Sequence, residues 1–383
     1  MKVAIATDGV FPEAMGGMQR HSRLLAEHLA RTGEVELTVL HPHPVGLFSA
    51  DLGIREVHVP PMDTEKFYLR ELWRYSKRMG EALEAVAPDV VLSQGFCVWQ
   101  GIGRFSEKLI THPHGLEMFQ GLTRKERALG APFRMALRHI VRRSHAVVSL
   151  GGKLTGILEG VARGSACKVV VIPNAVDVPE EEGALGSAHD KSNNATDHVP
   201  GPLVLLFVGR FAFNKGIDVL LEVAKRLVAE GKGNEVRFDL AGTGPLYQGI
   251  KAEGVPPNVS LLGRVDDAEL VSLYSTCDAF VLPTRFEGMP TVVLEAMAQA
   301  KPVFVSDVGA TAEQVDRLNG YLLPPGDVEA LHQAIRSFCA LSPESRGKMG
   351  RQSFDRVGEL FSWPAATMQF LRLFREVVRL TPR

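Results

Sequence analysis

Short apolar runs alternate with amphipathic segments along this chain. Near the N-terminus, an apolar run at residues 3–7 precedes a glycine loop, an amphipathic stretch at 18–30 and a second apolar run at 35–40. Short runs without polar alternation are typical of strands buried on both faces of a parallel sheet, and the amphipathic stretch has helical spacing. The order predicts a strand, a loop, a helix and a strand, which together form a βαβ unit.

The same order returns about two hundred residues later. An apolar run at 203–209 leads into a loop with Lys215 and Gly216, a helical stretch at 217–230 and another apolar run at 236–242. Two such openings in one chain predict two doubly wound α/β domains, each with its ligands at the carboxyl ends of its strands.

Two further segments complete the organisation. Residues 177–202 are rich in Gly, Pro, Ser, Asn and acidic residues, which is typical of a linker or surface loop. The C-terminal segment has apolar residues at helical spacing, but periodicity alone does not say which domain it covers. These residues are Phe370, Leu371, Phe374, Val377 and Val378.

Composition excludes several classes of protein. The 383 residues include 43 basic and 44 acidic ones, so no global charge favours nucleic acid. The four cysteines form no Cys-x-x-Cys pair, which argues against a zinc or disulfide framework. No leader pattern or membrane-spanning apolar run is evident, and we expect a cytoplasmic protein.

Arg210 and Lys215 are the first candidates for chemistry. Arg210 follows a buried-type strand and Lys215 immediately precedes a helix, so both positive charges and the N–H groups of the helix can point to one place. That arrangement suits a phosphate group. The alternative is that both are solvated charges on a surface loop.

Glycine turns supply weaker signals. Gly16 and Gly17 lie at the corresponding point of the first domain, where a backbone without Cβ atoms can approach a ligand closely. Gly242 and Gly244 follow another apolar run, and by themselves they are better explained by a tight strand-to-helix connection.

Residues 284–303 place Glu287 in a loop after a predicted strand and Glu295 on the helix that follows. We expect Pro290 at the first helical position, which leaves the helix N-terminus free. The two carboxylates could be the acid and base of a glycosidase, or could bind sugar hydroxyls beside a phosphate site. A third explanation makes Glu287 a partner of the helix dipole and Glu295 a surface residue.

His112 and His114 follow an apolar strand. A His-x-His pair can bind a metal ion, but no third ligand is evident from the spacing. The alternative is that a histidine contacts a substrate hydroxyl or a developing charge.

Two basic segments, 66–80 and 123–146, alternate Arg and Lys with aromatic and aliphatic residues at helical spacing. A solvated helix face explains them, and so does contact with an anionic membrane surface or an acidic acceptor.

Taken in order, the motifs resemble those of the retaining glycosyltransferases of family four, which have the GT-B fold. The resemblance covers nearly the whole chain and ends in the pattern of glutamate, seven residues and glutamate at 287–295. Ala175 departs from the family, which usually has glycine there. The matching segments are 16–21, 111–117, 171–177, 208–216, 240–245, 261–265 and 287–296.

The resemblance implies two Rossmann-like domains that face each other across a cleft. An acceptor-binding domain would span 1–173 and be completed by a crossover helix at 363–383. A linker at 174–202 would lead to a nucleotide-sugar-binding domain at 203–362. The implied reaction moves a hexose-type sugar from a nucleoside-diphosphate donor to a hydroxyl of a glycan, lipid or small-molecule acceptor, with retention and without a cofactor or metal.

The resemblance also implies roles for individual residues. Arg210 and Lys215 would neutralise the diphosphate, Glu287 and His114 would contact the transferred sugar, and Glu295 would bind the ribose. The remaining implied donor contacts are Gly16, Gly17, Gly244, Val265, Gly288, Met289, Pro290 and Thr291.

Other activities stay open at this point. A sugar-nucleotide epimerase, a phosphorylase or a non-catalytic nucleotide-sugar-binding protein could have the same fold. A NAD-dependent dehydrogenase is disfavoured because the first glycine turn lacks the Gly-x-Gly-x-x-Gly pattern.

Overall fold

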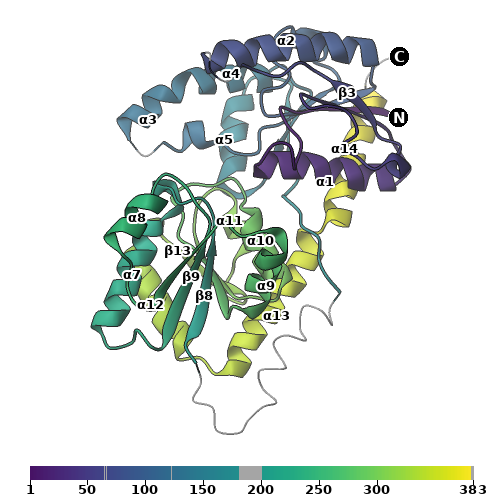
Figure 1. The fold of residues 1–383 in the computed structure, drawn as a ribbon. Coiled ribbons are helices and arrows are strands. Elements are labelled where there is room, and N and C mark those ends of the chain that lie inside the picture. Colours follow the sequence, from purple (N-terminus) through teal and green to yellow (C-terminus); the bar gives the residue numbers. More distant parts are fainter. Residues whose placement is uncertain (64, 66, 122, 181–200, 381–383) are drawn as a thin grey trace. The chain divides into compact units, whose positions relative to one another are not determined.

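The structure is a computed structural model that describes residues 1–63, 65, 67–121, 123–180 and 201–380 (Figure 1). The chain forms two compact units. Unit 1 combines Met1–Ala175 with the C-terminal segment from Trp363, and unit 2 is Val176–Ser362. Most of the predicted linker, residues 181–200, lies outside the described residues.

Unit 1 is built on a seven-stranded parallel sheet in the order β3-β2-β1-β4-β5-β6-β7. Within the described part of its loops lie the short 3-10 helices η1 (Ala50–Leu52), η2 (Ile102–Arg104) and η3 (Glu117–Phe119). Its strands are β1 (Lys2–Ala6), β2 (Glu36–His41), β3 (Arg55–His58), β4 (Val90–Gln94), β5 (Leu109–His112), β6 (Ala146–Ser149) and β7 (Lys168–Val171). Its helices are α1 (Gly17–Arg31), α2 (Tyr68–Val86), α3 (Arg124–Leu129), α4 (Ala131–Val141), α5 (Gly152–Ala162) and α14 (Trp363–Leu380).

Unit 2 has a six-stranded parallel sheet in the order β10-β9-β8-β11-β12-β13. Its strands are β8 (Leu203–Val208), β9 (Val236–Ala241), β10 (Val259–Gly263), β11 (Ala279–Leu282), β12 (Val303–Ser306) and β13 (Gly320–Leu323). Its helices are η4 (Phe213–Lys215), α7 (Ile217–Ala229), α8 (Tyr247–Glu253), α9 (Asp267–Thr276), α10 (Thr291–Ala298), α11 (Thr311–Gln314), α12 (Val328–Cys339) and α13 (Pro343–Leu360).

The continuous apolar runs form central strands, as their pattern predicts. In β1, Val3, Ala4, Ile5 and Ala6 are all buried, because helices cover both faces of the sheet. Side chains of one parity, such as Ile5, join one apolar core, and those of the other parity, such as Ala4, join a second core across the sheet. Both predicted βαβ openings are present, at β1-α1-β2 and β8-α7-β9.

Helix α14 resolves what periodicity left open. Phe370, Phe374 and Val377 join the core of unit 1 that also contains Leu25 and Leu29 of α1, and Figure 1 draws the two helices beside each other. The preceding helix α13 belongs to unit 2, so the chain crosses between the units near residue 362. The predicted α/β fold class with two Rossmann-like parts is therefore confirmed.

Among the described residues, every helix is too short or too polar to span a bilayer.

Candidate functional site

The strongest predicted residues of unit 2 lie at one edge of its sheet. Arg210 and Lys215 follow β8, and Glu287 follows β11. These two strands are neighbours at the point where the strand order reverses, because chain-consecutive strands run outward from them in opposite directions. In doubly wound sheets, ligands bind outside the carboxyl ends of the strands at this switch point.

Lys215 and Glu287 form an ion pair. The ammonium Nζ of Lys215 donates a hydrogen bond to Oε1 of Glu287, and only 24% of the lysine side chain and 13% of the glutamate side chain are exposed. Partial shielding from water strengthens the attraction relative to a fully exposed pair. The residue predicted to hold phosphate and the residue predicted to hold sugar are thus fixed side by side.

The two loops that carry this pair are joined by hydrogen bonds. The buried hydroxyl of Thr284 lies 2.8 Å from the carbonyl oxygen of Asn214 and 3.3 Å from Oε1 of Glu287. The backbone N–H of Arg285 donates to the same Asn214 carbonyl at 2.7 Å. The loop after β8 therefore cannot shift without moving the loop after β11.

Arg285 fastens both loops to helix α7. Its guanidinium donates to the two carboxylate oxygens of Asp218 at 2.8 and 2.6 Å and to the carbonyl of Phe213 at 2.6 Å. It also lies 3.9 Å from the centre of the Phe213 ring. Bidentate pairing and stacking fix the direction of an arginine side chain, so Arg285 positions Lys215 and Glu287.

The other predicted residues of unit 2 lie along the same edge. Gly244 follows β9, and a Cβ atom there would lie 2.6 Å from the carbonyl oxygen of Phe211, so the close approach requires glycine. The half-buried Val265 follows β10. This close packing explains why residue 244 is a glycine without invoking a ligand. Gly244 nevertheless lies next to the segment that carries Arg210.

The start of α10 differs from the expectation by one residue. Pro290 is the N-cap and Thr291 is the first helical residue, because Pro290 has an extended backbone. The carbonyl of Gly288 accepts from the Ala310 N–H at 2.9 Å. The side chain of Met289 is 3% exposed, so only its backbone can face a ligand.

Glu295 lies on α10, and its carboxylate accepts a hydrogen bond from the hydroxyl of Tyr274 at 2.9 Å. The oxygen Oε2 is therefore oriented by a tyrosine of the neighbouring helix α9. A surface residue with a free side chain would lack such a partner, so this contact disfavours the explanation that Glu295 is merely a surface carboxylate.

In unit 1, the predicted glycines and His114 also follow strands. Gly16 is the N-cap of α1 and Gly17 its first residue, after β1. His114 follows β5 and has a backbone φ of 61°, a left-handed conformation that a non-glycine residue adopts at an energetic cost. Its Nε2 lies 2.5 Å from Oε1 of Gln94. Backbone strain of this kind is concentrated at functional sites.

His114 belongs to a cluster of three imidazoles. The ring centres of His112 and His114 are 3.8 Å apart, and the ring of His21 from α1 lies 5.0 and 4.9 Å from them. Burial lowers the pKa of His21 to about 4. Burial and the neighbouring imidazoles also hold the pKa values of His112 and His114 well below the usual range, so all three rings are neutral at pH 7.

The sequence did not point to His21, Thr284 or Arg285. His21 lies in the amphipathic stretch of α1, and no spacing rule links it to a pair more than ninety residues away. The signals for Arg285 were a charge directly after a strand and an acidic residue in the first turn of α7. Their pairing becomes visible only when the strand order is known.

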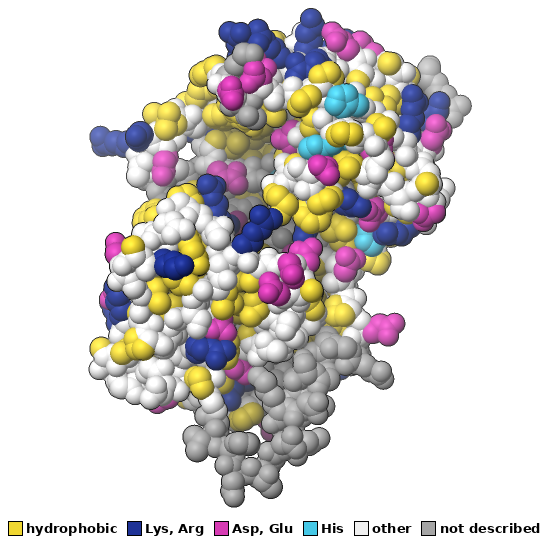
Figure 2. All heavy atoms as spheres, viewed as in Figure 1, with side chains coloured by type: hydrophobic (Ala, Val, Ile, Leu, Met, Phe, Trp, Pro, Cys, Tyr) yellow, Lys and Arg dark blue, Asp and Glu magenta, His cyan; other side chains and the backbone are white. Residues whose placement is uncertain are grey.

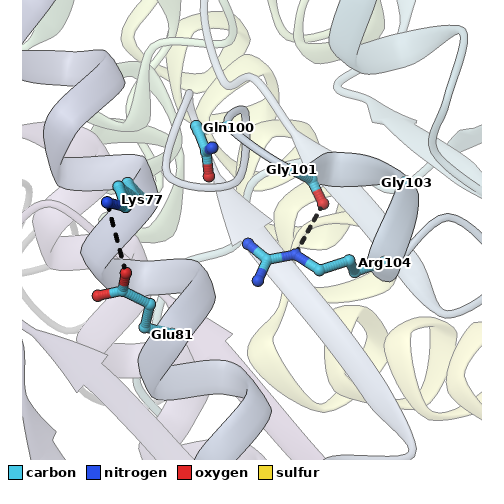
Figure 3. A pocket seen from close by; sticks show the side chains of 6 residues that line it. All are labelled: Lys77, Glu81, Gln100, Gly101, Gly103 and Arg104. Atoms are coloured by element: carbon cyan, nitrogen blue, oxygen red, sulfur yellow. Dashed lines mark hydrogen bonds and ion pairs between the residues drawn. The ribbon is translucent and has the colours of Figure 1, made fainter.

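Two cavities of about 450 Å³ lie elsewhere in unit 1. In the first, Lys77 faces Glu81, and Nε of Arg104 donates to the Gly101 carbonyl at 3.2 Å (Figure 3). The second is lined by Phe119, Gln120, Gly121, Arg127 and Arg134. None of the predicted site residues lines either cavity.

Two family models match consecutive parts of the chain. The model described as "Glycosyltransferase Family 4" matches residues 15–180, and the model described as "Glycosyl transferases group 1" matches residues 202–340. The first match lies almost wholly in unit 1 and the second lies in unit 2.

Curated relatives carry glycosyltransferase names. The chain is 28% identical over 179 residues to the alpha-D-kanosaminyltransferase of Streptomyces kanamyceticus. The aligned region covers 45% of this chain and 46% of that protein. It is 24% identical over 380 residues to the glycogen synthase of Mycobacterium tuberculosis strain H37Rv, which covers 92% and 89%. The chain spans about half the length of several of these relatives.

Solved structures with the same fold include a sucrose-phosphate synthase from Thermosynechococcus elongatus, with a TM-score of 0.77, 19% identity and coverage of 99% of this chain and 100% of that one. Another is Anabaena Alr3699/HepE in complex with UDP-glucose, with a TM-score of 0.69, 16% identity and coverage of 98% and 100%. These similarities establish the GT-B fold. The two family models and the curated relatives support a GT-B glycosyltransferase of the family-four type.

Proposed function

We propose that the protein transfers a hexose-type sugar from a nucleoside-diphosphate donor to a hydroxyl of a glycan, lipid or small-molecule acceptor, with retention. The observation that carries the proposal is the grouping of Arg210, Lys215 and Glu287 at the switch point of unit 2. The complex of the fold relative HepE with UDP-glucose supports a nucleotide-sugar donor.

The chemistry of the proposed reaction explains the cations. Cleavage of the bond between the anomeric carbon and the diphosphate puts negative charge on the leaving group. Arg210 and Lys215 would stabilise that charge in the transition state more than in the ground state. Lys215 is already oriented by Glu287, so little reorganisation is needed when the charge develops. The two cations supply the neutralisation that a metal ion would otherwise provide.

The remaining donor contacts are assigned by the family resemblance. Glu295 would bind the ribose hydroxyls, with Oε2 already oriented by Tyr274. Gly288, Met289, Pro290 and Thr291 would offer the backbone at the start of α10 to the sugar and phosphate. Val265 and Gly244 would border the base and the diphosphate. From unit 1, Gly16 and Gly17 would lie by the diphosphate and His114 by the transferred sugar.

We also propose that unit 1 contacts an anionic membrane surface. Phe67 is 73% exposed just before α2, and Met135 is 72% exposed on α4. The rings of Tyr68 and Phe133 are 6.0 Å apart, so these two regions adjoin. Figure 2 shows Lys and Arg side chains beside hydrophobic ones at the end of unit 1 that carries α2 and α4. Basic residues next to exposed apolar ones suit the interface of an anionic bilayer.

The donor can be identified by a thermal-shift screen of the full chain against UDP, GDP, ADP and their sugars. A ligand that binds only the native state at 100 times its Kd stabilises that state by about 2.7 kcal/mol. Product analysis with the stabilising donor then separates transfer to an acceptor from epimerisation or phosphorolysis. No stabilisation by any nucleoside diphosphate would refute the proposal.

Replacement of the cations gives the first prediction. We expect Arg210→Ala or Lys215→Ala to lower turnover about 100- to 1000-fold, by analogy with the loss of one donor to a developing oxyanion. Steady-state kinetics with the identified donor measure the change. Retention of full turnover in either variant would remove that residue from the leaving-group site.

The second prediction separates the sugar from the nucleotide. Glu287→Gln should impair sugar transfer more than binding of the free nucleoside diphosphate, because the carboxylate faces the sugar in our proposal. Calorimetry with the diphosphate and kinetics with the sugar nucleotide provide the two values. Abolished diphosphate binding would instead place Glu287 at the nucleotide.

The third prediction tests the backbone that holds Glu287. Gly309 has a φ of 55°, and a Cβ atom there would collide with the carbonyl oxygens of Glu287 and Gly288. Gly326 is a matched control, since its φ is 75° and its nearest neighbour, Nε of Arg285, would be 3.7 Å away. Both alanine variants have the left-handed backbone penalty of about 1 kcal/mol.

We expect Gly309→Ala to weaken donor binding at least about tenfold more than Gly326→Ala, because only the first displaces the Glu287 loop. Donor calorimetry on the two folded variants measures the difference. Equal affinities would show that the position of this loop does not control the donor site.

The fourth prediction concerns the membrane. Arg70→Gln removes one exposed charge from α2 and should lower the affinity for phosphatidylglycerol vesicles about fivefold. The reason is that each basic residue near an anionic surface contributes about 1 kcal/mol to binding. Vesicle co-sedimentation measures this affinity. The control is Met368→Ser, which changes an exposed residue of α14. Equal binding to zwitterionic vesicles, or no binding by the parent protein, would contradict the proposal.

A further inference from the structure

One cavity of unit 1, with a volume of about 450 Å³, is lined by two arginines and by no acidic side chain of the described residues. Its walls are Phe119, Gln120, Gly121, Arg127 and Arg134. We propose that this cavity binds a phosphate group and that the group belongs to the acceptor of the transfer reaction. The assignment to the acceptor rests on the proposed function, whereas the phosphate site itself does not.

Arg134 is held in a fixed direction in the cavity wall. Its Nη1 donates to the carbonyl oxygen of Met118 in η3 at 2.8 Å, and its Nη2 donates to the carbonyl oxygen of Arg127 in α3 at 2.8 Å. A guanidinium has five N–H donors, so three remain for a ligand. Because the group is planar and anchored on both Nη atoms, the remaining donors have defined positions, as the recognition of phosphate oxygens requires.

Gly130, where α3 meets α4, leaves room for this contact. A Cβ atom at residue 130 would lie 2.9 Å from Nη1 of Arg134 and 2.9 Å from the carbonyl oxygen of Met118. The carbonyl belongs to the backbone and cannot move aside without a shift of η3. A larger residue would therefore displace the hydrogen bond that orients the guanidinium.

Arg127 brings the second positive charge. Its Nε donates to the carbonyl oxygen of Gly121 at 3.0 Å, which ties the guanidinium to the loop after η3. Both of its Nη groups lack a hydrogen bond within the described part of the chain. Two positive charges on one cavity wall repel each other, and an anion that contacts both would offset the repulsion.

No acidic side chain of the described residues forms an ion pair with Arg127 or Arg134. Glu126 is adjacent to Arg127 in the sequence, but its Oε2 accepts the backbone N–H of Thr123 at 3.0 Å and caps α3. Arg134 is half-buried, and a partly desolvated charge without a counter-ion is unfavourable. The cavity therefore favours an anionic ligand.

The other cavity of similar size in unit 1 differs in this respect. It also has two cations, but Nζ of Lys77 lies 3.9 Å from the carboxylate of Glu81 (Figure 3). Nη1 of Arg104 lies 2.8 Å from the carboxylate of Glu84. These ion pairs leave little net charge for an anion. The distinguishing feature of the first cavity is therefore the unpaired charge of its arginines rather than its size.

Size and chemistry favour a phosphate ester of a sugar or small polyol. Cavities of about 300–1,000 Å³ typically hold small molecules, and the volume of about 450 Å³ lies in this range. A phosphate monoester presents three acceptor oxygens to the free N–H donors of the two guanidiniums. Phe119 supplies apolar surface for the carbon skeleton of such a ligand.

The cavity lies close in the chain to a predicted sugar contact. Phe119 follows His114 by five residues, so their Cα atoms are at most about 18 Å apart, and the η3 turn shortens this distance. His114 follows β5 at the carboxyl edge of the sheet. A phosphate held by the two arginines would therefore anchor an acceptor near the edge that carries His114.

Calorimetry on the full chain measures the site without any transfer reaction. The probes are glucose 6-phosphate and glycerol 3-phosphate, with glucose and glycerol as neutral counterparts and glucuronate as a carboxylate. We expect the phosphate esters to bind and the neutral compounds not to bind. Equal binding of glucose and its phosphate, or binding of glucuronate without either phosphate ester, would overturn the proposal.

A lipid headgroup could present the same phosphate group. Co-sedimentation with phosphatidic acid vesicles, for the parent protein and for Arg127→Gln, is the arm that identifies this source. Binding to the vesicles alone, with loss in the variant, would assign the phosphate to a lipid acceptor. Binding to neither the soluble esters nor the vesicles would refute the site.

Variants locate the phosphate. Arg127→Gln and Arg134→Gln should each lower the affinity for the bound phosphate ester at least about tenfold, because each removes charge-assisted hydrogen bonds. The matched control is Arg104→Gln, which removes an arginine whose Nε donates to the Gly101 carbonyl at 3.2 Å but which is paired with Glu84. This control should keep the parent affinity.

Arg210→Ala, which removes a cation of the candidate donor site, should also keep the affinity for the phosphate ester. A loss of binding in Arg210→Ala or Arg104→Gln, with none in the two cavity variants, would place the phosphate elsewhere and refute the proposal. Far-UV circular dichroism checks that each variant is folded. If Arg134→Gln does not fold because its contacts with η3 and α3 are lost, Arg127→Gln decides.

Failure of this site and failure of the proposed function give different results. Binding of a nucleoside diphosphate without any phosphate-ester binding would remove the site and leave sugar transfer intact, and the reverse result would refute transfer alone. With an active acceptor in hand, Arg127→Gln should lower the kcat/KM preference for the phosphorylated over the unphosphorylated acceptor at least about tenfold. An unchanged preference would show that Arg127 does not contact the acceptor phosphate.

Discussion

The ion pair between Lys215 and Glu287 is the interaction on which the candidate site of unit 2 depends. It joins loops that follow different strands, and its geometry is set by Thr284 and by the bidentate contact of Arg285 with Asp218. Neither loop has regular structure of its own apart from the short η4 turn. Their conformation therefore comes from these polar contacts, which leave the cation and the carboxylate oriented before any ligand arrives.

The two sheets supply the frame for both groups of site residues. Parallel strands buried on both faces place all their carboxyl ends at one edge, so loops far apart in sequence meet there. In unit 2 this edge carries Arg210, Lys215 and Glu287. In unit 1 it carries Gly17, His112 and His114, and α14 completes the core below them through Phe370 and Phe374. The same principle thus explains a polar cluster in one unit and an imidazole cluster in the other.

The sequence predicted what depends on local pattern and missed what depends on strand order. Apolar runs predicted the strands, and the loop after each run predicted Arg210, Lys215 and Glu287 as site residues. Periodicity could not place α14, because a stripe such as Phe370 and Phe374 fits any apolar surface of the right width. Arg285 and His21 were missed for a related reason. Their partners lie on other elements, and the spacing of residues along the chain does not show which elements pack together. Pro290 was placed one residue too far into its helix, because proline fits both the N-cap and the first turn.

Hydrogen–deuterium exchange on the full chain tests the central claim, that the loops after β8 and β11 form the donor site. The nucleoside diphosphate that stabilises the protein would be compared with buffer alone, and exchange would be followed peptide by peptide. We predict protection concentrated in residues 208–216 and 284–295, with the other loops of unit 2 far less affected. Protection that spares both segments, or that lies only at other loops, would contradict the account.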